Sequence, residues 1–160
     1  MLLVRGPNVM QGYLGRADLT ASVMRNGWYV TGDVAQEDED GFLQITDRLS
    51  RFSKIGGEMV SHGRLEEALH EAAGVEERVF AVTAVSDERK GERLAVLHTL
   101  SEVSIPGILK KVAAQGVPSL FIPRCDRFLS VSRIPILGSG KVDLCEVRRI
   151  AAERLAALGG

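Results

Sequence analysis

The chain has 160 residues, of which 45% are hydrophobic, and its formal net charge at pH 7 is -1. This length and composition suffice to bury an ordinary core, and the dispersed basic residues provide no positive field for a nucleic-acid partner. No apolar run approaches the roughly 20 residues that a membrane-spanning helix needs, so no transmembrane segment is expected.

The first third of the chain predicts short elements. Residues 17–24 have the apolar spacing of a short helix, which Asn26-Gly27 ends. Residues 34–47 predict a hairpin around the acidic turn at 37–41, and apolar–polar alternation over 42–46 predicts a half-buried strand. The acidic turn is interpreted as a solvated loop rather than a metal site, because so exposed a run offers no closure around phosphate.

The rest of the chain predicts helices and strands in one compact domain. Ser61 and Gly74 are the expected start and stop of a helix whose apolar face holds Leu65 and Leu69. Two β-rich runs, 79–85 and 94–100, are expected to pair antiparallel through the turn at 87–91. A helix over 104–115 with Ser104 as its expected cap, a strand over 124–131 and a final amphipathic helix follow. The last has an apolar stripe of Leu144, Val147, Ile150, Ala151, Leu155 and Leu158.

Four short motifs follow one another along the chain. They are Tyr29-Val-Thr-Gly-Asp33, Asp40-Gly41-Phe42, the run from Arg48 through Lys54 to Gly57-Glu58, and Pro135-Ile-Leu-Gly-Ser-Gly-Lys141. In this order the chain resembles the adenylate-forming enzymes, the superfamily of acyl-CoA synthetases and luciferases. The resemblance covers nearly the whole chain. It implies a ligase that uses ATP and Mg²⁺ to turn a fatty acid into an acyl-adenylate, and then transfers the acyl group to a thiol.

The finer wording of two segments is similar to a narrower group. Arg51-Phe-Ser-Lys-Ile-Gly-Gly-Glu-Met-Val-Ser61 and Ile136-Leu-Gly-Ser-Gly-Lys141 look most like the acyl-acyl-carrier-protein synthetase half of bacterial 2-acylglycerophosphoethanolamine acyltransferases. This resemblance implies that the acceptor is the phosphopantetheine thiol of acyl carrier protein or CoA.

The resemblance gives two residues a nucleotide-binding role. Asp33 would accept hydrogen bonds from both ribose hydroxyls of ATP, and Arg48 would bind the ribose beside it. From the residues alone, Asp33 is more simply a turn carboxylate and Arg48 a surface ion-pair partner. Ser50 occupies the family's hinge position, where Asp or Lys is usual. Asp47 replaces the family's glycine before the arginine, an acidic neighbour expected to weaken ATP binding.

Lys141, in the Gly138-Ser-Gly-Lys141 loop, is the candidate catalytic residue. The loop lacks the first glycine and the final Ser or Thr of a phosphate-binding P-loop, because Pro135 and Val142 occupy those positions. A lone loop of this kind is usually a mobile surface turn. The resemblance implies instead that the Lys141 ammonium contacts the acyl carboxylate and the α-phosphate while one attacks the other.

Gly56 and Gly57 form a glycine pair that permits a tight turn or a close approach to a ligand. The resemblance implies that they border the tunnel through which the pantetheine thiol reaches the adenylate. The simpler alternative is that Gly57 only supplies a positive φ angle. His62 and His70 are interpreted as solvated or packing residues, since no nucleophile motif accompanies either.

The expected fold is α+β: residues 1–49 as the β-rich end of a large adenylation domain, and 50–160 as a lid domain with a small antiparallel sheet and packed helices. The phosphate loop, the adenine pocket, the acyl tunnel and the Mg²⁺-binding glutamate would lie in the missing N-terminal domain, so the isolated chain is expected to be inactive. A non-catalytic module that binds acyl carrier protein or acyl-CoA, and a structural remnant, remain alternatives.

Only two cysteines are present, Cys125 and Cys145, without the spacing of a zinc knuckle or a redox pair. Free thiols and the absence of a signal peptide predict a cytoplasmic protein with no bound metal. A position at the inner face of the membrane is expected only if the full-length protein carries an acyltransferase or membrane domain.

Overall fold

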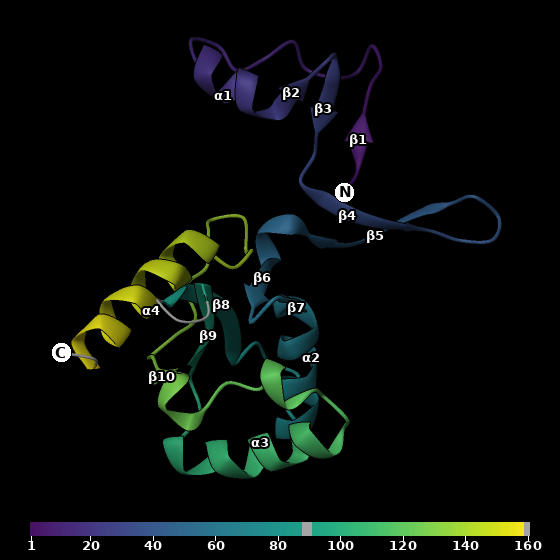
Figure 1. Ribbon diagram of the computed structural model, residues 1–160. Coiled ribbons are helices and arrows are strands. Elements are labelled where there is room, and N and C mark those ends of the chain that lie inside the picture. The colour runs from purple at the N-terminus through teal and green to yellow at the C-terminus, as the bar shows by residue number, and fades with distance from the viewer. Residues whose placement is uncertain (88–90, 159–160) are drawn as a thin grey trace. The chain divides into compact units, whose positions relative to one another are not determined.

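The computed structural model describes residues 1–87 and 91–158. The chain divides into two compact units, Met1–Ser50 and Arg51–Gly160, called unit 1 and unit 2 below. Helices and small sheets of short strands make up both units (Figure 1), which confirms the predicted α+β class.

Unit 1 consists of short strands and one helix. Its three-stranded antiparallel sheet has the order β1 (Leu3–Val4), β3 (Trp28–Val30), β2 (Met24–Arg25), and α1 (Ala17–Val23) precedes β2. A separate hairpin joins β4 (Asp33–Glu37) to β5 (Leu43–Arg48), as predicted. No residue from 1 to 50 is buried, so side-chain packing within this unit contributes little to holding these strands.

The burial predicted for one face of the second hairpin strand is wrong. Phe42, Leu43 and Ile45 are 72%, 59% and 59% exposed. The hairpin β4–β5 extends away from the three-stranded sheet of unit 1 (Figure 1), and only residues 33–35 and 47 of its two strands are half-buried. Alternation predicts which residues share a face of a strand, but it does not predict whether another element packs on that face.

Unit 2 is built on a five-stranded sheet. Its order is β10 (Phe128–Ser130), β9 (Gly91–His98), β6 (Phe52–Ile55), β7 (Glu58–Ser61), with β8 (Phe80–Asp87) paired along β9. The pairs are antiparallel except for β10, which runs parallel to β9. The two predicted runs at 79–85 and 94–100 thus pair as expected, while residues 88–90 of their predicted turn lie outside the described residues.

Three helices cover the two faces of this sheet. Leu65, Leu69 and Val112 of α2 (His62–Ala73) and α3 (Ile105–Ala114) are buried with Val82 and Val96. Ala151 and Leu155 of α4 (Leu144–Leu158) pack on the opposite face. The sheet therefore has apolar packing on both faces, which is why its long strands β8 and β9 are almost continuously apolar.

Three local predictions need correction. The strand expected over 124–131 is confined to β10, because residues 125–127 form a 3₁₀ turn. Ser104 precedes α3 but makes no side-chain cap, since its Oγ donates to the Ser101 carbonyl at 2.6 Å. Leu158, expected on the buried stripe of α4, is exposed at the end of that helix. By contrast, Ser61 caps α2 and Gly74 ends it with φ 68°, as predicted.

Candidate functional site

Asp33 and Arg48, the predicted nucleotide-binding residues, lie opposite each other on the paired strands β4 and β5. The Arg48 Nε is 2.9 Å from Asp33 Oδ1, and the two side chains are 67% and 14% exposed respectively. The register shifts between Val34 and Ala35, so Thr46 is the extra residue of a β-bulge. Through this register the structure brings the two predicted residues together in one ion pair.

The turn before Asp33 is held by hydrogen bonds to both neighbouring segments. Asp33 N–H donates to Thr31 Oγ1 at 3.0 Å, and that hydroxyl donates to the Leu2 carbonyl at 2.9 Å. Leu49 N–H donates to the Gly32 carbonyl at 2.7 Å. Gly32 has φ +75°, a conformation that favours glycine. The Thr-Gly-Asp sequence thus fixes the backbone at Asp33 without a buried core. The sequence motif alone does not indicate this structural role of Thr31.

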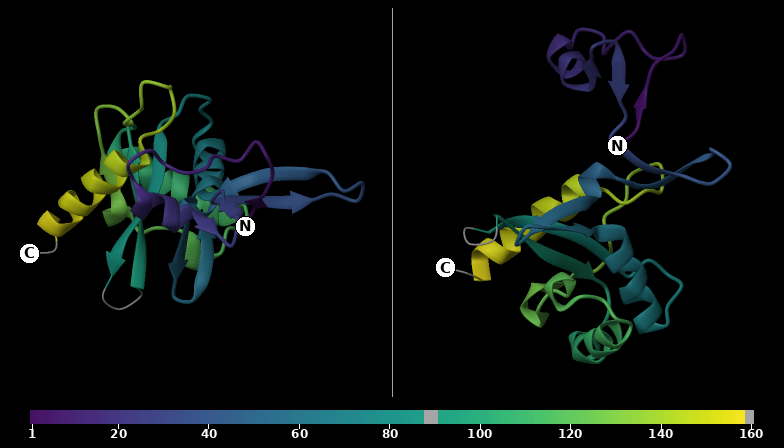
Figure 2. Two further views of the ribbon diagram at one scale, coloured as in Figure 1. Left: turned by 90° about the horizontal axis from the view of Figure 1, so that it is seen from above. Right: turned by 45° about the vertical axis from the view of Figure 1, so that its right-hand side comes forward.

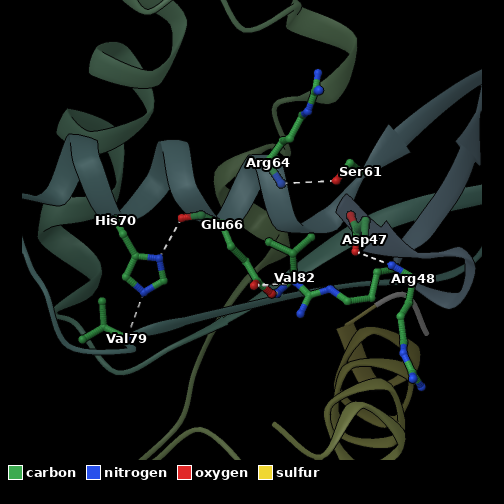
Figure 3. A network of polar contacts seen from close by, with 9 residues as sticks. Asp47, Arg48, Ser61, Arg64, Glu66, His70, Val79 and Val82 are labelled. Atoms are coloured by element: carbon green, nitrogen blue, oxygen red, sulfur yellow. Dashed lines mark hydrogen bonds and ion pairs between the residues drawn. The ribbon is translucent and has the colours of Figure 1, made fainter. Parts of the chain in front are cut away.

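Ser50, the predicted hinge residue, is the last residue of unit 1. It lies in the middle of a single 3₁₀ turn over Leu49–Arg51. Just before it, Asp47 Oδ1 accepts a hydrogen bond from the Arg48 backbone N–H at 2.7 Å (Figure 3). In this conformation the Asp47 carboxylate is engaged with the backbone of the next residue.

Lys141 lies on an exposed loop that unit 2 closes with backbone hydrogen bonds. Leu137 N–H donates to the Lys141 carbonyl at 2.7 Å, Gly140 N–H donates to Leu137 at 2.9 Å, and residues 136 and 142 form an isolated β-bridge. Gly140 has φ +79°, so the second glycine of the motif is needed for the turn. The loop is therefore a closed turn with an exposed lysine at its end.

Gly56 and Gly57 form the two-residue turn between β6 and β7. The register pairs Ile55 with Glu58, and the two glycines have φ +58° and +100°. These signs are those of the tight turns that best match the twist of a hairpin. A Cβ placed on Gly57 would meet no atom within 4 Å, so this position faces open space in unit 2.

The predicted nucleotide-binding, catalytic and tunnel residues are therefore divided between the two units. Asp33 and Arg48 form one pair in unit 1, while Lys141 and the glycine pair belong to unit 2. Within unit 2, the turn between β6 and β7 and the loop over 136–142 lie at opposite ends (Figure 2, left). The lysine and the glycine turn therefore lie apart from each other within one compact unit.

A polar network at the start of unit 2 was not recognised from the sequence. Glu66 on α2 contacts the Arg51 guanidinium, with Nη2 2.6 Å from Oε2, and also accepts the Val82 N–H at 2.7 Å. Glu66 contacts residues 15 and 16 positions away along the chain, and local spacing in the sequence does not reveal such partners.

A cavity of about 520 Å³ lies elsewhere in unit 2, and none of the predicted site residues lines it. His98, fully buried, lines it, and burial lowers the pKa of this imidazole below its ordinary value. Its Nδ1 is 3.1 Å from the Leu100 carbonyl; because a carbonyl only accepts, Nδ1 carries the proton. Exposed residues such as Cys125 and Leu158 also line this cavity, so it opens to solvent and is separate from the candidate site.

Two further observations bear on possible ligands. Among residues 1–87 and 91–158, no three His, Cys, Asp or Glu side chains gather so as to hold a metal ion. No helix within these ranges is long and apolar enough to cross a membrane.

Curated relatives resemble the chain over most of its length. The chain is 37% identical over 151 residues to a feruloyl-CoA synthase of Amycolatopsis sp., a match that spans 92% of the chain and 30% of that protein. It is 36% identical over 134 residues to a long-chain-fatty-acid–CoA ligase of Yersinia pestis, covering 84% of the chain and 22% of that protein. Its homologues are adenylate-forming enzymes of the acyl-CoA ligase family. No protein-family model matches the chain.

Solved structures of this adenylate-forming family share the fold. The amide bond synthetase McbA from Marinactinospora thermotolerans aligns with a TM-score of 0.72 and 31% identity, over 94% of the chain and 30% of McbA. The chain therefore spans about 30% of the length of such relatives, and it corresponds to their C-terminal part.

Proposed function

We propose that this chain acts as the C-terminal lid of an ATP-dependent acyl-activating ligase. The observation that carries the proposal is the match of nearly the whole chain to the C-terminal part of CoA ligases, with the Asp33–Arg48 pair formed and Lys141 exposed. In the first half-reaction a carboxylate oxygen attacks the α-phosphorus of ATP and pyrophosphate leaves. In the second, a thiol sulfur attacks the acyl carbonyl and AMP leaves.

In this proposal Asp33 and Arg48 bind the ribose of ATP. An ionised carboxylate accepts several hydrogen bonds, so Asp33 can hold ribose hydroxyls while its Oδ1 remains next to Arg48. The largely exposed Arg48 guanidinium has further N–H donors for the ribose oxygens. The residues present thus fit a ribose. Mg²⁺ enters the proposal only as the companion of ATP, with no ligand assigned among the described residues.

Lys141 supplies positive charge to the first half-reaction. Its ammonium would align the acyl carboxylate with the α-phosphate and stabilise the charge that accumulates in the transition state. The closed turn over 137–141 favours this role, since the backbone of Lys141 is fixed where the loop closes while its side chain stays exposed. Gly56 and Gly57, at the other end of unit 2, would border the path of the thiol in the second half-reaction.

The proposal includes a large N-terminal adenylation domain, of which residues 1–49 are the end, and a lid formed by residues 50–160 that pivots at Ser50. The exposed apolar residues of the hairpin β4–β5, Phe42, Leu43 and Ile45, are the surface we assign to contact with that domain. Because unit 1 has no buried residue, covering this surface would supply apolar burial that the unit lacks by itself.

We further propose a fatty acid as the substrate and a phosphopantetheine thiol as the acceptor. The motif wording at residues 51–61 supports acyl carrier protein, as in the acyl-acyl-carrier-protein synthetase half of the acyltransferase group, whereas the names of the relatives support CoA. ATP and CoA are cytoplasmic metabolites, and we place the enzyme in that compartment, or at the inner face of the membrane if the full-length protein also carries an acyltransferase or membrane domain.

The test is a chimera in which this chain replaces the corresponding C-terminal part of the Amycolatopsis feruloyl-CoA synthase. The isolated chain with ATP, Mg²⁺ and fatty acids should release no pyrophosphate above the blank. The chimera, given ferulate and ATP, should form the adenylate and then the thioester with CoA or with carrier protein. Comparing the rates of thioester formation with the two acceptors decides whether CoA or acyl carrier protein is preferred.

Lys141→Ala in the chimera should lower adenylate formation by about 10²–10³-fold, the loss typical of removing one stabilising group from a reacting centre. Thioester formation from preformed adenylate should change far less. If both half-reactions fall equally, Lys141 has only a structural role. A folded chimera that makes no adenylate but binds carrier protein or acyl-CoA would instead favour the non-catalytic module.

A further inference from the structure

The carboxylate of Glu66 joins the first residue of unit 2 to the edge of its sheet. Oε2 is 2.6 Å from Nη2 of Arg51, the residue that follows the boundary between the units. Oε1 accepts the backbone N–H of Val82 on β8 at 2.7 Å, and Figure 3 shows the Glu66 side chain reaching from α2 to that strand. Both carboxylate oxygens therefore have a strong donor.

A second side chain of α2 fixes the helix against the same segment. His70 Nδ1 lies 2.7 Å from the Glu66 carbonyl, which can only accept, so Nδ1 carries the proton. His70 Nε2 then accepts the Val79 N–H at 3.2 Å (Figure 3). With two backbone N–H groups of residues 79 and 82 bound by α2, the Glu66 carboxylate has a fixed position relative to the sheet.

The Arg51–Glu66 contact is stronger than an ordinary surface pair. The two side chains are only 21% and 16% exposed, and the contact is a charge-assisted hydrogen bond of 2.6 Å. Partial removal of water strengthens such a bond, and leaving either charge without the other would be costly. Arg51 is thus tied by its side chain to the interior of unit 2, although its main chain comes directly after the boundary.

We propose that Arg51 and Glu66 are a positioning pair that sets the end of the pivot between adenylation and thioester formation. From Arg51 onward the chain moves as part of the lid, and the backbone rotation is confined to the residues up to Ser50. This inference rests on the proposed lid function and adds a role for two residues that the motif reading left without one. If the rotation is confined to a few residues, the lid has two defined orientations. If more residues take part in it, the range of each orientation becomes wider.

The first measurement is hydrogen exchange on the 160-residue chain, which needs no catalysis. Arg51→Gln should raise the exchange of the amides at Phe52 and Ser53 by about tenfold, the effect of losing one charge-assisted hydrogen bond. Glu66→Gln should do the same while the Val82 amide stays protected, because the glutamine oxygen can still accept its N–H. The matched control is Arg149→Gln, which removes an exposed pair on α4 and should leave residues 52 and 53 unchanged.

The second measurement uses the feruloyl-CoA synthase chimera in single-turnover mode. Arg51→Gln should let the adenylate accumulate about tenfold more before thioester forms, with the KM for ATP unchanged, and Arg51→Lys should restore most of the wild-type course. A merely structural pair would lower the melting temperature without changing this partition.

Unchanged exchange at residues 52 and 53 in both variants overturns the anchoring, and unchanged adenylate accumulation in an active chimera overturns the positioning role. If the wild-type chimera makes no adenylate, the lid function itself fails, while the exchange result still decides whether Glu66 anchors Arg51.

Discussion

The two units of this chain position their candidate functional residues by different means. In unit 1 no residue is buried, and Asp33 is held by the turn of Thr31 and Gly32 and by the ion pair with Arg48. Unit 2 has a sheet packed on both faces, and Lys141 and Gly57 lie on turns outside that core. The packed sheet of unit 2 therefore supports both candidate turns, whereas unit 1 relies on hydrogen bonds to the backbone and on a solvent-exposed arginine.

The largest effect should follow from removing core volume in unit 2. Leu97 on β9 is fully buried, so Leu97→Ala should lower the free energy of unfolding by about 2–5 kcal/mol. Leu43→Ala makes the same chemical change on the exposed strand β5 of unit 1 and should change it by about 0.5 kcal/mol or less. Urea unfolding followed by far-ultraviolet circular dichroism measures both.

The single tryptophan, Trp28, lies in unit 1, and its fluorescence is a second probe of unfolding in urea. If the units differ as described, Trp28 fluorescence should change at lower urea than the helical signal, and Leu97→Ala should move only the latter transition. Coincident transitions, or equal losses for Leu97→Ala and Leu43→Ala, would show that the units unfold together. Leu97→Met, which conserves volume, should cost less than about 1.5 kcal/mol.

The same contrast explains what could be predicted from the sequence. In unit 2, local signals agreed with tertiary packing: Ser61 and Gly74 bound α2, and the apolar runs of β8 and β9 pair as expected. The motif reading also selected Asp33 and Arg48, which the register of β4 and β5 places opposite each other. In these cases the structural requirement is local or repeated along one element.

The features missed by sequence reading depend on what lies across space. The exposure of Leu43 depends on whether another element covers the hairpin, and the parallel pairing of β10 depends on where the chain returns to the sheet. Glu66 could not be assigned because Arg51 and Val82 are distant in sequence. Side-chain periodicity carries no information about such partners.

A smaller effect should distinguish a structural role of the β6–β7 turn from a role in thioester formation. Gly57→Leu in the chimera should lower thioester formation by about tenfold or more while sparing adenylation, if the thiol passes beside this glycine. Because Gly57 has φ +100°, leucine there is strained whatever its surroundings, and about 1 kcal/mol of stability should be lost as well. Both half-reactions and the melting temperature are therefore measured together.

Gly74→Leu is the matched control for that strain. Gly74 also has a positive φ and open space around its Cβ position, but it ends α2 instead of forming the β6–β7 turn. Equal losses of melting temperature, with thioester formation blocked only by Gly57→Leu, would support the tunnel assignment. A stable Gly57→Leu chimera that still transfers acyl groups normally would leave the turn with a purely conformational role.

The smallest expected effect concerns pH and the core of unit 2. Burial lowers the pKa of His98 in the folded chain below its ordinary value of 6.5, so the unfolded chain binds the proton first as pH falls. Stability should therefore be unaffected by His98 above this value and should decline below it, with a slope of at most about 1.4 kcal/mol per pH unit, until the folded-state pKa is reached. Glu102, whose charge raises this pKa, and the Leu100 carbonyl reduce the effect without changing its sign.

His98→Gln, which keeps a donor for Leu100 and does not titrate, should flatten the change in melting temperature between pH 7.5 and 5.5. His70→Gln, a change outside the cavity around His98, should retain the His98 contribution to the slope. Equal slopes in wild type and His98→Gln would mean that the acid sensitivity of the chain arises outside this buried imidazole.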